Sequence, residues 1–218
     1  MKVELVGLTQ PSATTGCNSA SQLVAYAARV SNPENQNNEK TAPKLLKYLI
    51  KNEHWSPFEM VSIQMSITTT RDISRQIIRH RTFSFQEFSQ RYAEVPDMTY
   101  KREARLQDNK NRQNSLEIDD KHPSAREFSR IQDMLGHDAL AKYNEALELG
   151  IAKEQARALL PEGLTETTLI MAGTLRSWIH YCQLRMGNGT QKEHRQIAEK
   201  CWQVVVGHFP ELETVFDE

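Results

Sequence analysis

One stretch of the chain alternates apolar and polar residues. From Val61 to Ile67 every odd-numbered residue is apolar, and short polar side chains lie between them. A period of two places one kind of side chain on each face of an extended strand. Residues 59–70 are therefore predicted to form a strand buried on one face. Residues 165–174, which are rich in β-branched side chains, and the short segment 2–8 indicate two further strands.

Apolar residues three and four positions apart predict helices in much of the remaining chain. The predicted ranges are 18–30, 41–52, 71–79, 124–149, 153–160, 175–185 and 190–206. The apolar stripe of the longest helix comprises Phe128, Ile131, Leu135, Leu140, Tyr143 and Leu147, and Gly150 is a typical helix end. Strands and helices do not alternate as βαβ units, which favours an α+β fold.

Two polar motifs predict helix starts. The pairs Thr190 with Glu193 and Ser56 with Glu59 have the spacing of a capping box, in which each side chain binds a backbone N–H of the first turn. Residues 101–120 are instead highly charged and poor in apolar residues. We expect them to form a charged, solvated excursion from a single domain that spans residues 1–218.

Composition and charge disfavour several classes of protein. The 218 residues include 27 Lys and Arg and 28 Asp and Glu, for a formal net charge of -1. This balance disfavours general nucleic-acid binding, so an anion site must be built locally. Three widely spaced cysteines and seven scattered histidines predict neither disulfides nor a metal site. No stretch approaches the roughly 18 apolar residues of a membrane span, and we expect a cytoplasmic protein.

Residues 79–91, with the sequence RHRTFSFQEFSQR, concentrate groups that bind anions. If the preceding helix continues, Gln76, Arg79 and His80 share one face and converge on one ligand. Arginine side chains match phosphate oxygens in a bidentate manner, and a serine hydroxyl can complete such a site. The stretch therefore predicts a local anion site.

The second half of this stretch is predicted to be extended. Such a backbone places Glu87, Ser89 and Arg91 on one side, facing a small polar molecule. The alternative is a solvated basic edge with a structural ion pair between Glu87 and Arg91. Composition does not separate the two interpretations.

The motif R-H-R-x2-S-x4-S-x-R distinguishes between the binding site and the solvated basic edge. Its defined residues are Arg79, His80, Arg81, Ser84, Ser89 and Arg91. With the segments AARVS (27–31), HWSPFE (54–59), SRQIIRHR (74–81), QARALLP (155–161) and GTLRSWIHYCQLR (173–185), the chain resembles the flavin-dependent thymidylate synthases. The resemblance implies a central antiparallel sheet flanked by helices, and a homotetramer with active sites shared between subunits.

The resemblance also implies an activity. These enzymes convert deoxyuridylate (dUMP) to thymidylate (dTMP), with methylenetetrahydrofolate as one-carbon donor and FAD reduced by NADPH as hydride source. The implied dUMP-binding residues are Gln76, Arg79, Glu87, Ser89, Gln90, Arg91, Arg157 and Arg185. The implied catalytic residues are Arg185, which would stabilise negative charge on the uracil ring, and Ser89. Neither nucleic acid nor a membrane is an expected partner.

The implied FAD-binding residues come from several segments. They are Ser31, Ser56, Glu59, Arg79, His80, Arg81, Glu87, Thr174, Arg176 and His180. Because the chain has no G-x-G-x-x-G motif, side chains would have to bind the pyrophosphate. Thr174 departs from the asparagine, and Gly189 from the histidine, that the family often has at these positions.

Several of these residues also have structural interpretations. Ser56 and Glu59 fit a capping box, His180 fits a core histidine, and Arg176 fits an ion pair with an acidic neighbour. Ser89 has no evident base to activate it, so a hydrogen-bonding role is favoured over a covalent one. Cys182 is interpreted as a packing residue.

Two other functions are alternatives to the enzyme. One is an RNA- or DNA-binding module that uses the arginines with Phe83, Phe85 and Phe88 as a stacking platform. The other is a protein of this fold that binds the nucleotide without catalysis. Near-zero net charge disfavours the first, and the presence of both Arg157 and Arg185 disfavours the second.

Overall fold

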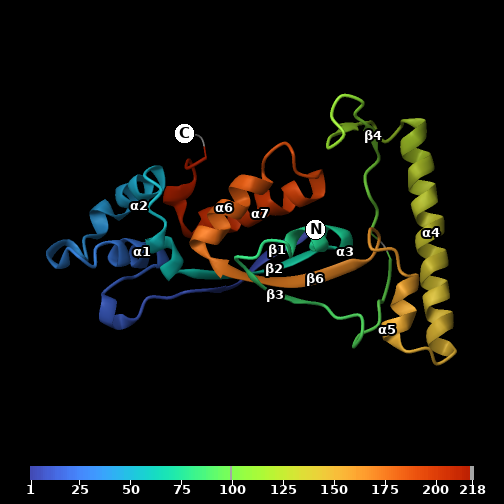
Figure 1. The fold of residues 1–218 in the computed structure, drawn as a ribbon, viewed down its shortest axis with the longest axis horizontal. Coiled ribbons are helices and arrows are strands. Elements are labelled where there is room, and N and C mark those ends of the chain that lie inside the picture. The colour runs from blue at the N-terminus through green and yellow to red at the C-terminus, as the bar shows by residue number, and fades with distance from the viewer. Residues whose placement is uncertain (99, 217–218) are drawn as a thin grey trace.

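An antiparallel sheet runs through the middle of the molecule (Figure 1). The computed structural model describes residues 1–98 and 100–216. The strand order is β1-β2-β6-β3, with bounds Lys2–Leu8 for β1, Ser62–Thr70 for β2, Glu166–Thr174 for β6 and Ser84–Glu87 for β3. The α+β fold with a central antiparallel sheet in a single domain is confirmed.

The helices that surround the sheet lie close to the sequence ranges that the apolar periodicity predicts. The bounds are Ala20–Ala28 (α1), Ala42–Lys51 (α2), Arg71–Ile77 (α3), Pro123–Glu148 (α4), Lys153–Ala156 (α5), Leu175–Arg185 (α6) and Lys192–His208 (α7). Helices α6 and α7 lie over the sheet, α1 and α2 lie at one end, and α4 and α5 stand at the other end (Figure 1). None of the described helices has the length and apolar character needed to cross a membrane.

The main core lies between one face of the sheet and the helices. Ile63, Met65 and Ile67 of β2 are buried, whereas the residues between them are half-buried, as the alternation predicts. Trp178 of α6 is also buried, and its indole N–H donates to the Ile63 carbonyl at 3.1 Å. This bond satisfies a polar group that would otherwise be costly to bury.

A glycine in β6 lets an aromatic ring reach this core. A Cβ atom at Gly173 would lie 2.4 Å from Cδ1 of Phe83. Because Gly173 has no side chain, Phe83 packs edge-on against Trp178, with ring centroids 4.8 Å apart. Phe83 is therefore a core residue, and it is unavailable to the stacking platform of the nucleic-acid-binding alternative.

The apolar stripe predicted along α4 is buried only in part. Tyr143 is fully buried, in a small second core with Val95 and Leu160. Phe128 and Leu135, in the N-terminal half, are exposed. The prediction fails there because the N-terminal half of α4 stands away from the sheet (Figure 1). Gly150, at φ 80°, follows the helix as expected.

Neither predicted capping box forms. Helix α7 begins at Lys192 after Gln191, and no side chain caps it. Residues Ser56–Met60 form a short 3₁₀ helix, η4, preceded by Trp55, again without a side-chain cap. In both cases the chain enters the helix one residue away from the position that the motif requires, because tertiary contacts override the local preference.

Residues 101–120 contain a small hairpin where the sequence predicts a solvated excursion. Strand β4 (Arg105–Gln107) pairs with β5 (Ser115–Glu117). The side chain of Lys192 on α7 reaches Glu103 and Glu117, at 2.9 and 2.6 Å. The charged residues of this segment thus serve partly as ion-pair partners for α7.

Candidate active site

The RHR motif lies in a turn between α3 and β3. Helix α3 ends at Ile77, and the backbone N–H of Phe83 donates to the carbonyl of His80 at 3.2 Å. Arg79 and Arg81 are exposed and line a cavity of about 570 Å³ that Phe83 also lines. His80 points to the other side, toward Arg185. The predicted convergence of Gln76, Arg79 and His80 is therefore wrong for Arg79, because the helix ends before it.

A carboxylate at the end of β3 organises a second group of residues. Glu87 accepts hydrogen bonds from Ser74 at 2.8 Å and from Thr167 at 3.0 Å. The guanidinium groups of Arg71 and Arg75 lie 3.8 and 3.7 Å from the same carboxylate. Burial lowers the pKa of Arg71 despite the nearby charge of Glu87. Glu87 thus holds two arginines of α3 at the sheet edge.

These arginines line a cavity of about 450 Å³, which we call the arginine half-site. Gln90 and Arg157 also line it, as do Glu154 and Glu162, whose charges are paired with Arg91 and Arg75. Gln90 is only 3% exposed, yet its amide nitrogen has no hydrogen-bond partner, and neither does Nη1 of Arg71. Buried donors without acceptors are costly. The arrangement fits an anionic ligand that supplies the acceptors.

The segment after β3 turns instead of continuing as a strand. The backbone N–H of Arg91 donates to the hydroxyl of Ser89 at 3.3 Å, a local serine turn. Arg91 is exposed and lies 3.2 Å from Glu154. The prediction that Glu87, Ser89 and Arg91 share one side is therefore wrong, because extended backbone ends at Glu87.

A third group surrounds the last residue of α6, and we call it the histidine half-site. Arg185 donates from Nε to Nε2 of His80 at 2.9 Å, and the His80 ring contacts Tyr181 edge-on at 4.8 Å. Burial and the charge of Arg185 lower the pKa of His80 to about 4. His80 is thus a neutral acceptor at pH 7. His194 and Gln76 complete this half-site, joined by a hydrogen bond of 3.3 Å.

The remaining predicted flavin residues gather along α6 and η4. Arg176 pairs with Glu59 at 2.5 Å, as the ion-pair interpretation expects. His180, one turn further along α6, contacts Trp55 edge-on at 4.4 Å. His180 is exposed, so the core-histidine interpretation is wrong. Ser56 precedes Glu59 and is also exposed. These residues form the α6 face.

Helix α6 also contacts the RHR turn. Thr174 caps the helix by accepting from the backbone N–H of Ser177 at 3.2 Å, so it has a structural role here. The hydroxyl of Ser177 donates to the carbonyl of Thr82 at 3.4 Å. The α6 face and the exposed arginines of the motif are therefore neighbours. Ser31 is exposed in the turn after α1, and Gly189 is exposed after α6.

Sequence reasoning missed several residues of these groups. Arg71 lies outside the segments that carry the resemblance, and Arg75 lies within one of them but at no defined position of the motif, although both are cations that contact Glu87. His194 and Gln191 lie on the far side of Gly189, and no local pattern marks them. Cys182 is buried, which raises its pKa and keeps the thiol protonated, in agreement with a packing role.

The chain matches a protein family and known proteins over nearly its whole length. The family described as thymidylate synthase complementing protein matches residues 13–211. A probable flavin-dependent thymidylate synthase of Paramecium bursaria Chlorella virus 1 is 49% identical, over 100% of this chain and 99% of the relative. A flavin-dependent thymidylate synthase of Synechocystis is 47% identical, over 96% of both chains. The chain belongs to the family of flavin-dependent thymidylate synthases.

A solved structure supports the same conclusion for the fold. The UMP/dUMP methylase PolB of Streptomyces cacaoi, bound with 5-Br dUMP, superposes with a TM-score of 0.81 at 28% identity. The match covers 99% of this chain and 94% of PolB. In this flavin-dependent thymidylate synthase, Arg79 and Arg81 of the motif line the exposed cavity, and His80 lies in the histidine half-site. Gln90, from the same stretch, lines the arginine half-site.

Proposed function

We propose that the chain methylates dUMP to dTMP, with methylenetetrahydrofolate as one-carbon donor and NADPH as the source of reducing equivalents. The observation that carries this proposal is the arginine half-site, where Gln90 and Arg71 present buried donors without acceptors. A phosphate monoester supplies several acceptor oxygens and two negative charges. Arg157 lines the same cavity and adds a cation. This half-site suits the phosphate of the nucleotide.

The histidine half-site suits the base. Arg185 uses its Nε to bind His80, so the terminal nitrogens of its guanidinium remain as donors. A cation there stabilises the negative charge that develops on the uracil carbonyls as C5 becomes nucleophilic. Because His80 is neutral, it orients Arg185 without adding a competing positive charge. Ser89, with its hydroxyl in a serine turn, acts as a ligand and not as a nucleophile.

The exposed residues of the RHR turn suit FAD. Arg79 and Arg81 are free to bind a pyrophosphate at the cavity they line, and the half-buried Phe85 supplies an apolar wall. The neighbouring α6 face adds Arg176, His180 and Ser56. When bound, FAD supplies the hydride that reduces the transferred one-carbon unit. His80, between Arg79 and Arg81 in the sequence, contacts Arg185 in the histidine half-site.

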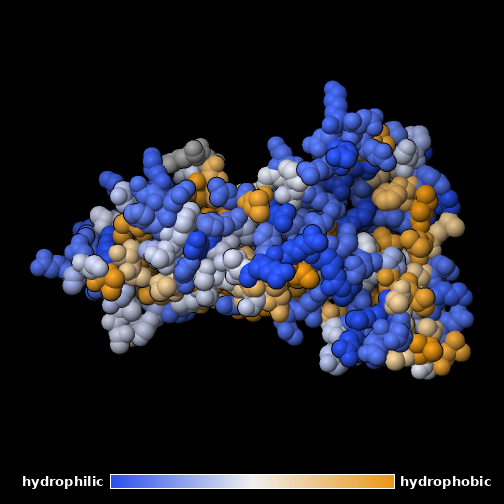
Figure 2. Space-filling view, viewed as in Figure 1, coloured by the Kyte–Doolittle hydropathy of each residue, from blue (hydrophilic) through white to orange (hydrophobic). Residues whose placement is uncertain are grey.

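We further propose a homotetramer in which each active site uses more than one subunit. Arg75 and Gln76 are adjacent on α3, and adjacent helix positions point about 100° apart. Arg75 lines the arginine half-site, whereas Gln76 faces α7. Apolar residues exposed along α4 also suit a subunit contact, and Figure 2 shows them at one end of the molecule. They are Phe128, Ile131, Met134 and Leu135.

The activity assay tests the proposal directly. Purified protein with FAD, dUMP, methylenetetrahydrofolate and NADPH under anaerobic conditions is expected to form dTMP. Arg185→Ala is expected to lose at least about a hundredfold in kcat, since it removes a cation that acts in the transition state. The control is Arg130→Ala, which removes an exposed ion pair with Glu127 on α4. Absence of dTMP with flavin-loaded wild type would contradict the proposed activity.

A further inference from the structure

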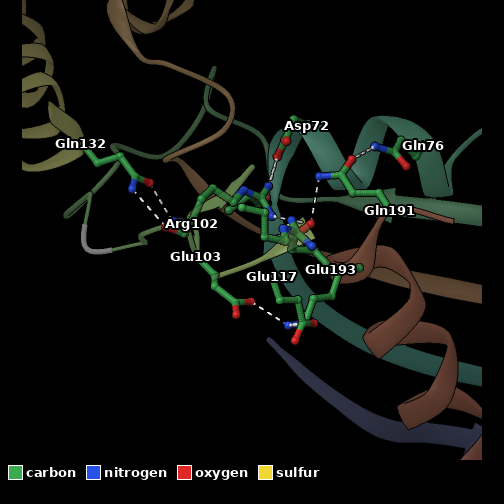
Figure 3. Close-up of polar contacts among 11 residues, drawn as sticks. Asp72, Gln76, Arg102, Glu103, Glu117, Gln132, Gln191 and Glu193 are labelled. Atoms are coloured by element: carbon green, nitrogen blue, oxygen red, sulfur yellow. Dashed lines mark hydrogen bonds and ion pairs between the residues drawn. The ribbon is translucent and has the colours of Figure 1, made fainter. Parts of the chain in front are cut away.

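A chain of hydrogen bonds links the core to Gln76. The hydroxyl of Tyr181 lies 3.1 Å from Nε2 of His194, and Nδ1 of His194 lies 3.3 Å from Oε1 of Gln76. The amide nitrogen of Gln76 donates to Gln191 at 2.8 Å. That of Gln191 donates to Glu193 at 2.9 Å (Figure 3). Both His194 and Tyr181 are buried, so neither can exchange these partners for water.

The carboxylate of Glu193, at the outer end, determines the donor and acceptor of every hydrogen bond in this series. Burial by itself would raise the pKa of Glu193, but hydrogen bonds from Arg105 and Gln191 help to outweigh it and lower this pKa. An ionised carboxylate only accepts hydrogen bonds. Gln191 therefore donates to it and uses its own carbonyl to accept from Gln76.

The inner hydrogen bonds, from Gln76 to Tyr181, have fixed directions too. Because the nitrogen of Gln76 donates to Gln191, its carbonyl oxygen faces His194 and must accept from Nδ1–H. Nε2 of His194 then carries no proton and accepts from the Tyr181 hydroxyl. Burial, with the charge of Arg185, lowers the pKa of His194 to about 3, which agrees with this neutral tautomer.

One N–H of Gln76 takes no part in this series of hydrogen bonds. The amide group has two N–H donors, and only one is used by Gln191. Gln76 is half-buried and lies in the half-site that contains Arg185. A rigidly held donor beside the base recognises an acceptor oxygen, whereas a rotated amide would present its own carbonyl there and repel it.

We propose that His194, supported by Tyr181, is a positioning residue that keeps an N–H of Gln76 directed at a carbonyl of the pyrimidine base. This inference rests on the proposed function, which places the base in the histidine half-site. It predicts that the amide orientation, and not merely the presence of Gln76, determines the affinity for dUMP. His194 itself does not touch the nucleotide.

The test compares two substitutions at one position. His194→Leu removes the donor to Gln76, whereas His194→Asn places an amide nitrogen near the position of Nδ1 and can still donate. We expect KM for dUMP to rise about tenfold in His194→Leu with kcat nearly unchanged, because one uniform binding contact is lost. In His194→Asn we expect most of the affinity to return. Ile197→Val, a buried change on the same helix, is the packing control.

A variant outside the core keeps the inference testable if His194→Leu fails to fold. Gln191 is exposed, and Gln191→Leu should raise KM for dUMP in the same direction by about threefold. Inhibition by deoxyuridine, which lacks the phosphate, should weaken by the same factor in each variant. Equal dUMP affinity of the Leu and Asn variants at position 194, or unchanged deoxyuridine affinity, would overturn the inference. Wild type that binds no dUMP would instead overturn the proposed function.

Discussion

At the scale of single residues, the histidine half-site keeps two imidazoles neutral beside a permanent cation. His194 is fully buried, and it is surrounded by Tyr181 and Arg185 of α6 and by His80. A protonated His194 would be a buried cation next to Arg185, so desolvation and charge repulsion both disfavour its protonation. The neutral form is also the one that the hydrogen-bond chain requires.

This burial predicts acid-sensitive stability. Below about pH 6.5 the unfolded chain protonates His194, whereas the folded chain does so only near pH 3. Stability from this group is therefore complete above pH 6.5 and falls as the pH is lowered toward 3. His194→Gln removes the titration, so its loss of stability between pH 7 and 5 should be about 2 kcal/mol smaller than that of wild type.

Urea unfolding at the two pH values measures this difference. The exposed histidine of α4 provides the control, because His137→Gln should leave the pH dependence of wild type in place. If His194→Gln loses as much stability as wild type between pH 7 and 5, the depressed pKa of His194 is not the cause.

Residue roles were predictable from sequence only where a motif links them. Arg79 and Arg81 lie in a short recognisable motif, and both are exposed at one cavity. Arg71 and His194 have no such mark: each becomes a site residue because the fold places it beside Glu87 or Gln76. Contacts between residues more than 100 positions apart, as for His194 and Gln76, are not encoded in any local pattern.

At the scale of elements, an ion network links the segment before α4 to α3 and to α7. Arg102 donates to Asp72 at 2.6 Å, and its backbone is bound by the amide of Gln132 on α4 (Figure 3). Arg105 pairs with Glu193 at the start of α7, where Arg102 also lies within 3.7 Å. Glu193 is buried, so these are largely desolvated pairs.

Breaking this network should be costly. Glu193→Gln leaves Arg105 without its buried counter-charge and Arg102 with Asp72 alone, and we expect a loss of about 3 kcal/mol in the free energy of unfolding. Glu127→Gln removes the exposed pair with Arg130 and should cost at most about 1 kcal/mol. Urea denaturation at pH 7 measures both. Similar costs for the two variants would show that the network contributes no more than a surface ion pair.

Element types were predicted well and element ends poorly. The alternation in β2 and the apolar repeat of α2 reflect burial on one face, so both elements lie close to their predicted positions. The capping box predicted for α7 fails because Glu193 accepts from Gln191 and Arg105. In the second predicted box, Glu59 pairs with Arg176 instead. Polar residues at helix ends bind whichever partner the tertiary fold brings near.

At the scale of the whole molecule, the two half-sites lie on different sides of α3. The cavity with Arg157 extends toward α5, while Arg185 lies at the end of α6 against His80. One nucleotide that uses both residues is accommodated most simply if they come from neighbouring copies of the chain. The apolar residues exposed on α4 provide area for such a contact.

Mixing two inactive variants tests this arrangement. Arg157→Ala damages only the arginine half-site, and Arg185→Ala damages only the histidine half-site. If each active site combines half-sites from two subunits, random co-assembly of equal amounts yields some sites with both half-sites intact. Such sites should restore about a quarter of wild-type dTMP formation. The subunits must exchange for this to occur, so the variants are mixed in mild denaturant and refolded together.

The control for this experiment mixes two variants of the same half-site. Arg157→Ala with Gln90→Ala should stay inactive, because no pairing of these chains supplies an intact arginine half-site. Restored activity in the first mixture and none in the second would establish that the nucleotide is bound between subunits. Inactivity of both mixtures, with tetramers present by sedimentation, would instead require one chain to bring Arg157 and Arg185 to the same nucleotide, by a rearrangement around α3.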